Sequence, residues 1–121
     1  MKEKILAVIL FAVTIIFVTV NTIIIDRQIT DVIDDVEGLD LGAENSINDA
    51  YSIYEDFMKK QDYLSITVSH NDMTSIEDCF VEMIGYISVK DIENATVVKY
   101  RLKNSLEHLR RLSGFNIDAI I

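Results

Sequence analysis

Two histidines stand close to carboxylates in this sequence and are its best candidates for metal ligands. His70 and Asp72 form an H-x-D pair, and His108 follows Glu107. Two imidazoles and a carboxylate are a ligand set used by transition metals. His70, Asp72 and His108 would form such a site if the helices that carry them pack side by side. The helix motif of zinc proteases, H-E-x-x-H, is absent, so the simpler alternative is a hydrogen-bonded histidine at the start of a helix.

The single cysteine and the paired carboxylates offer little further chemistry. Cys79 lies on an apolar helical stripe, which predicts a buried thiol, and a lone cysteine excludes an internal disulfide. Asp34–Asp35 and Glu55–Asp56 are adjacent pairs, and adjacent helical positions do not face the same point. Phosphate-binding loops, dinucleotide fingerprints and nucleophile elbows are absent. We therefore expect no enzyme activity, no catalytic residues and no cofactor.

The stretch from Ile5 to Ile25 predicts a transmembrane helix. Fifteen of its 21 residues are Ile, Leu, Val or Phe, and none is charged. A helix of this length covers about 30 Å, the thickness of the hydrocarbon core of a bilayer. On the insertion scale these fifteen residues favour the membrane by at most about 5–9 kcal/mol. A cleaved signal peptide needs small residues at a cut site, and none follows Ala12 until Gly38, so we expect the helix to be retained.

Basic residues around this helix predict its orientation. Lys2 and Lys4 precede it, whereas only Arg27 follows it closely. The positive-inside rule then places residues 1–4 in the cytoplasm and residues 26–121 outside the cell membrane. The sequence therefore predicts a single-pass membrane protein with an uncleaved signal anchor.

Helical periodicity continues after the anchor, and the chain contains no proline to interrupt it. Ile29, Val32, Ile33 and Val36 form one stripe, which predicts that the anchor helix runs on to Glu37. A glycine-containing turn then ends this helix.

Three further apolar stripes predict three more helices. The first contains Ile47, Tyr51, Tyr54, Met58, Gln61, Leu64 or Ser65, and Val68. The second contains Met73, Ile76, Cys79, Phe80, Met83, Ile84 and Ile87. The third contains Ile92, Ala95, Val98, Leu102, Leu106, Leu109, and Leu112 or Ser113. A β-branched run predicts a kink or break near Ser65–His70, Gly85 suits the close approach of another helix, and Gly114 is expected to end the last helix.

These patterns predict an all-α fold, in which the N-terminal transmembrane helix leads into a small antiparallel helical bundle. The charge distribution supports the pairing of its helices. Residues 26–56 hold ten acids and one base, whereas residues 99–111 hold five bases and one acid. We expect the acidic early helices to pack beside the basic last helix.

Overall charge and the apolar tail indicate the kind of partner. The formal net charge of −9 repels nucleic acid, so we expect no nucleic-acid partner. The anchor provides contact with the bilayer. The tail FNIDAII is too short to span a membrane and either folds back on the bundle or presents an apolar patch for a protein partner or self-association. The residues expected to interact are Phe115, Ile117, Ile120 and Ile121.

The chain resembles a bacterial family catalogued as domain of unknown function 4363, whose members have an N-terminal membrane helix and a small helical domain. The residues that carry the likeness are His70-Asn71-Asp72-Met73 with Ile76-Glu77, Leu106-Glu107-His108-Leu109, and Phe115-Asn116-Ile117. The family commonly has a tryptophan in its first half, where this chain has tyrosines. The resemblance implies location and architecture and brings no activity or site residues.

Two hypotheses follow. The first is a non-enzymatic single-pass protein whose helical bundle acts as an accessory, scaffold or interaction module for another membrane or envelope component. The alternative is a ligand-sensing or metal-binding helical module that uses His70, His108 and nearby carboxylates.

Overall fold

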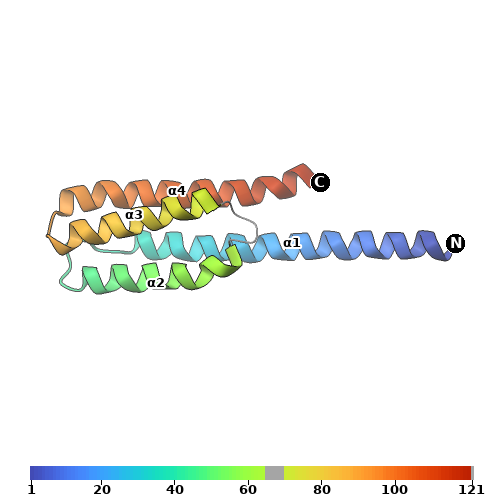
Figure 1. The fold of residues 1–121 in the computed structure, drawn as a ribbon, viewed down its shortest axis with the longest axis horizontal. Coiled ribbons are helices and arrows are strands. Elements are labelled where there is room, and N and C mark those ends of the chain that lie inside the picture. The colour runs from blue at the N-terminus through green and yellow to red at the C-terminus, as the bar shows by residue number, and fades with distance from the viewer. Residues whose placement is uncertain (65–69, 121) are drawn as a thin grey trace.

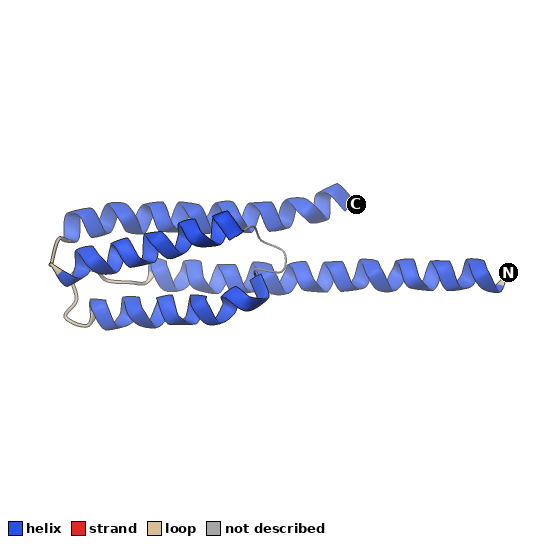
Figure 2. Ribbon diagram, viewed as in Figure 1, coloured by secondary structure: helices blue, strands red, loops and turns tan. Residues whose placement is uncertain are grey.

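Four helices make up the chain in the computed structural model, which describes residues 1–64 and 70–120 and, within residues 113–120, the backbone alone. They are α1 (Lys2–Glu37), α2 (Ser46–Leu64), α3 (His70–Ser88) and α4 (Ile92–Ile120). The described ranges contain no strand (Figure 2). The predicted all-α fold, with a long apolar first helix leading into a bundle, is confirmed.

Helix α1 runs unbroken through 36 residues and has two different environments. Its first half projects beyond the bundle, and its second half lies among the other helices (Figure 1). The bundle buries the predicted stripe of Ile29, Val32, Ile33 and Val36, and it also buries Thr22 and Ile25, which the sequence assigned to the transmembrane stretch. Because no proline or glycine occurs between Lys2 and Glu37, the backbone passes from one environment to the other without a kink.

The bundle closes as a ring of four antiparallel helices. Contacts join α1 to α2, α2 to α3, α3 to α4 and α4 back to α1. Phe57 and Phe80 are fully buried at its centre, with ring centroids 5.4 Å apart. The ring of Tyr54 lies 5.5 Å from that of Phe80. Around them pack the remaining large core side chains, which include Leu64, Met73, Ile76, Met83, Leu102, Leu106 and Leu109.

Opposite charges join α1 to α4, as the sequence predicted. The Nζ of Lys103 lies 2.7 Å from Oε1 of Glu37. The Lys99 ammonium donates to the carbonyl oxygen of Leu39 at 2.8 Å. These two lysines fix the first half of α4 against the end of α1 and the turn that follows. Each exposed pair adds little stability, so their value is in setting which residues lie side by side.

The buried face of α2 differs from the predicted stripe. Tyr51 was expected in the core but is 49% exposed, whereas Phe57 was left off the stripe and is fully buried. The buried positions are Ser46, Ala50, Phe57 and Leu64. Two phases of apolar residues overlap on this helix, and the phase that includes the small Ala50 lets neighbouring helices approach more closely.

Two glycines play different roles from those predicted. Gly85 was expected to admit a neighbouring helix, but a Cβ atom built there would meet nothing within 4 Å. Gly114 was expected to end the last helix, yet α4 continues to Ile120. A single glycine lowers helix stability by only about 1 kcal/mol, which does not terminate a helix unless a cap or turn replaces the lost hydrogen bonds. The predicted kink at Ser65–His70 falls mostly on residues 65–69, which lie outside the described residues.

Candidate functional site

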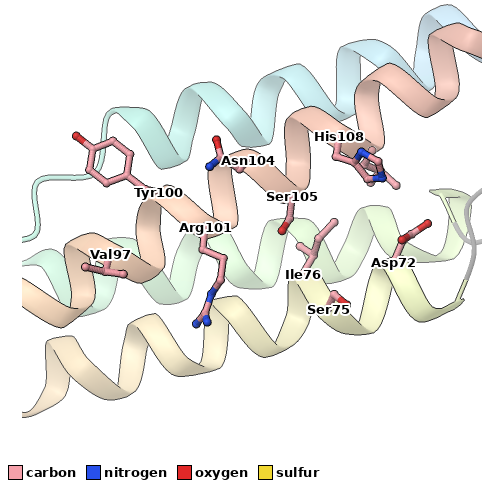
Figure 3. Close-up of a pocket in the computed structure, with 10 residues that line it drawn as sticks. Asp72, Ser75, Ile76, Val97, Tyr100, Arg101, Asn104, Ser105 and His108 are labelled. Atoms are coloured by element: carbon pink, nitrogen blue, oxygen red, sulfur yellow. The ribbon is translucent and has the colours of Figure 1, made fainter.

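A shallow groove of about 540 Å³ lies between α3 and α4 and holds two of the three candidate metal ligands, Asp72 and His108 (Figure 3). Asp72, Ser75 and Ile76 line it from α3. Helix α4 contributes Val97, Tyr100, Arg101, Asn104, Ser105, His108 and Leu109. The antiparallel pairing of α3 and α4 places the start of α3 opposite the later turns of α4, which brings Asp72 and His108 to the same end of the groove.

The proposed metal ligands do not form a coordination set. Among the described residues, no group of three or more His, Cys, Asp or Glu side chains could hold a metal ion. His70 and His108 are both exposed. The groove contains Asp72 and His108 but not His70. The structure therefore brings two of the three candidates to one surface and leaves the third apart.

A nucleophile and base are not aligned in the groove either. Ser105, His108 and Asp72 share it, but within the described residues no hydrogen bond joins His108 to Ser105. The guanidinium of Arg101 is bonded to the Glu82 carboxylate, which ties α4 to α3. A catalytic pair needs mutual hydrogen-bond reach and an orienting third group. What the groove offers is an open surface with an exposed Tyr100 and Val97 beside polar groups.

The sole cysteine is buried as predicted. Cys79 is 7% exposed in the interior face of α3. Burial raises the pKa of its thiol, and the nearby Arg101 guanidinium offsets this only partly. A neutral, buried thiol is a poor nucleophile and metal ligand, so Cys79 functions as a small core residue.

A polar contact that sequence patterns did not indicate marks the point where α1 leaves the bundle. The Tyr63 hydroxyl, near the end of α2, donates to Oδ1 of Asn21 on α1. Asn21 is the only amide in the predicted transmembrane stretch. Its partner lies 42 residues away, so only the bundle topology reveals the pairing. A polar residue late in an apolar span is the one signal in the sequence that could have drawn attention to Asn21.

The predicted transmembrane stretch and the bundle share one and a half turns of α1. Thr22 and Ile25 are buried among the other helices, whereas Ile5, Leu10, and Ile16 are more than half exposed. Helix α1 is long and apolar enough to cross a membrane. The part of it that no other helix covers is residues 2–20, which are all exposed except the partly covered Val18. The predicted interaction residues Phe115, Ile117, Ile120 and Ile121 lie outside the residues whose side chains the structure describes.

Comparison of the chain with family models, with curated proteins and with solved structures found no match. The resemblance to the family catalogued as domain of unknown function 4363 therefore stays a prediction.

Proposed function

We propose that this chain is a single-pass membrane protein that holds a small helical bundle close to one face of the bilayer as an accessory or scaffold module. The observation that carries the proposal is the continuity of α1. One helix supplies both the exposed apolar segment 5–20 and part of the bundle core. An exposed apolar surface of this extent is unfavourable in water and is satisfied by lipid.

Retention of the anchor is supported by the shared turns. Cleavage after the apolar stretch, near Ile25, would remove Thr22 and Ile25 from the core. A cleaved signal peptide is dispensable to the mature fold, and this helix is not. The positive residues Lys2 and Lys4 support an N-terminus in the cytoplasm and a bundle outside.

Extraction of membranes carrying the full chain tests the anchor. We expect the chain to stay in the pellet after an alkaline carbonate wash. Replacing Phe11 and Ile15 with lysine adds about 5–7 kcal/mol to the cost of insertion, so this variant should be released. The matched control replaces the same two residues with leucine and should stay in the pellet. Release of the unaltered chain would refute the proposal.

Orientation is tested with an impermeant thiol reagent on intact cells, in a Cys79→Ser background. Gly85→Cys is suitable for the bundle because position 85 is exposed and has open space around it. Lys2→Cys reports the N-terminus. We expect labelling at position 85 before lysis and at position 2 only after lysis; the opposite pattern would place the bundle in the cytoplasm.

A scaffold role requires a partner, and the α3–α4 groove is the surface we expect to contact it. Val97 and Tyr100 are each more than 60% exposed there. A photo-crosslinking residue at position 100 should give a specific adduct in intact membranes. The same residue at Tyr51, which is exposed on α2, serves as the matched control. Recovery of only uncrosslinked monomer from both positions would refute the scaffold role.

A further inference from the structure

The contacts between α1 and α4 set the height of every residue of α4 relative to the anchor. Lys103 pairs with Glu37, and the two helices run antiparallel. Both rise about 1.5 Å per residue, so each step along α4 past Lys103 is level with one step back along α1. Residue 115 is then level with about residue 25, and residue 120 with about residue 20.

The end of α4 therefore reaches the height at which α1 becomes an exposed apolar helix. Figure 1 shows α4 extending past the start of α3, in the direction of the N-terminus of α1. The helical backbone continues to Ile120, and the sequence from Phe115 to Ile120 reads FNIDAI. This mainly apolar segment, which also carries Asn116 and Asp118, thus ends at the height where the exposed part of α1 meets the bundle.

Basic and acidic residues are nearly balanced just inside this end. Arg110 and Arg111 precede the last turns of α4, whereas Arg27 directly follows Asp26 and Lys60 pairs with Asp56 at 3.0 Å. The Tyr63–Asn21 contact sets the height of α2 in the same way and places Lys60 level with about residue 24. The opposite end of the bundle is acidic and carries Asp34, Asp35, Glu37, Asp40, Glu44 and Asp49. The net negative charge of the bundle is thus concentrated away from the anchor.

We propose that the last turns of α4, residues 115–120, enter the head-group layer of the bilayer that α1 crosses, with Arg110 and Arg111 at the level of the lipid phosphates. Cations beside an apolar helical segment are the arrangement that anionic lipid surfaces attract. The bundle would then be attached at two points, and the second point would fix its tilt. This inference rests on the proposed membrane crossing by α1.

The chain contains no tryptophan, so single-tryptophan variants report one position each. Three full-length variants in vesicles of phosphatidylcholine and phosphatidylglycerol with brominated acyl chains form the test. Phe11→Trp lies in the anchor, Phe115→Trp in the end of α4, and Tyr51→Trp toward the acidic end of the bundle. We expect strong quenching at position 11, clear quenching at position 115 and none at position 51.

The outcomes separate this inference from the proposed function. Quenching at position 11 without quenching at position 115 would overturn the second attachment and leave the anchor in place. Absence of quenching at position 11 would overturn the membrane crossing itself. Quenching at all three positions would mean that the bundle lies flat on the lipid, which also contradicts attachment by its end.

A second set of variants controls for the possibility that the introduced tryptophan itself draws the end of α4 to lipid. Arg110→Glu and Arg111→Glu are added together to Phe115→Trp. We expect quenching at position 115 to fall by at least half in anionic vesicles and to change little in pure phosphatidylcholine. Equal quenching with and without the charge reversal in anionic vesicles would overturn the role of the two arginines. A second copy of the chain could instead occupy this end. Efficient disulfide formation between Phe115→Cys chains, together with no quenching in the separate Phe115→Trp variant, would show that it does.

Discussion

Because α1 has two environments, the same substitution is expected to destabilise the bundle in one half of the helix and to leave its stability unchanged in the other. Ile29 is 1% exposed in the bundle, whereas Ile16 is 62% exposed in the segment that projects from it. Replacing either residue with alanine removes the same atoms from the same helix. Since both variants share the change in helix propensity, the difference between them reports packing alone.

The magnitude follows from burial. Truncating a buried isoleucine to alanine lowers stability by about 2–5 kcal/mol, because transfer free energy is lost and a cavity remains. A domain of this size is stable by only about 5–15 kcal/mol. With a urea m value of about 1.5 kcal/mol per molar, Ile29→Ala should lower the unfolding midpoint by about 1–3 M. Ile16→Ala should leave the midpoint unchanged.

Urea titration of the full chain in a mild non-ionic detergent is the assay, followed by circular dichroism and tyrosine fluorescence. Detergent keeps the projecting half of α1 helical, so the transition reports the bundle. A loss of stability as large for Ile16→Ala as for Ile29→Ala would refute the division of α1 into two environments. An unchanged midpoint for Ile29→Ala would refute its place in the core.

Three further predictions concern single contacts. Tyr63→Phe removes the hydrogen bond to α1 and should lower stability by about 1 kcal/mol in the same titration. The pKa of Glu37 is lowered, first by its hydrogen bond with Lys103 and then by the charge of that lysine. Stability from this pair is therefore complete above the ordinary carboxyl pKa of 4.5 and is lost as the pH falls through the lower folded-state value. Glu37→Gln should show a smaller acid-side loss when the midpoint is followed to below pH 4.5. Cys79 should react with thiol reagents much more slowly than Gly85→Cys in a Cys79→Ser background, because burial shields the thiol and raises its pKa.

Local periodicity determined how much of this fold could be predicted. All residues of the apolar stripe predicted for α3 are buried in the structure, because one apolar face dominates the sequence of that helix. Helix α2 carries two competing stripes, and the choice between Tyr51 and Phe57 depends on neighbours that are distant in sequence. The same holds for Asn21, whose partner Tyr63 becomes apparent only when α1 and α2 are placed side by side.

For the candidate site, too, residue types determine some features and the topology of the fold determines others. Residue types singled out His70, Asp72 and His108 as candidate ligands, but the antiparallel pairing of α3 and α4 brings only Asp72 and His108 to one groove. Heights along a bundle depend on long-range contacts such as Glu37–Lys103. No spacing within one helix contains that information.

The proposed membrane crossing by α1 would link folding of the bundle to insertion of the anchor, because the two share the turn that holds Thr22 and Ile25. Rotating or withdrawing the apolar half would move Thr22, Ile25 and Ile29 relative to the other three helices, because the backbone between the two halves has no flexible residue. Proteins that only need tethering use a flexible linker, which leaves a domain free to turn. A helix that is both span and core instead fixes the height and direction of the bundle. That geometry suits a module that must present one surface, the α3–α4 groove, at a constant distance from the membrane.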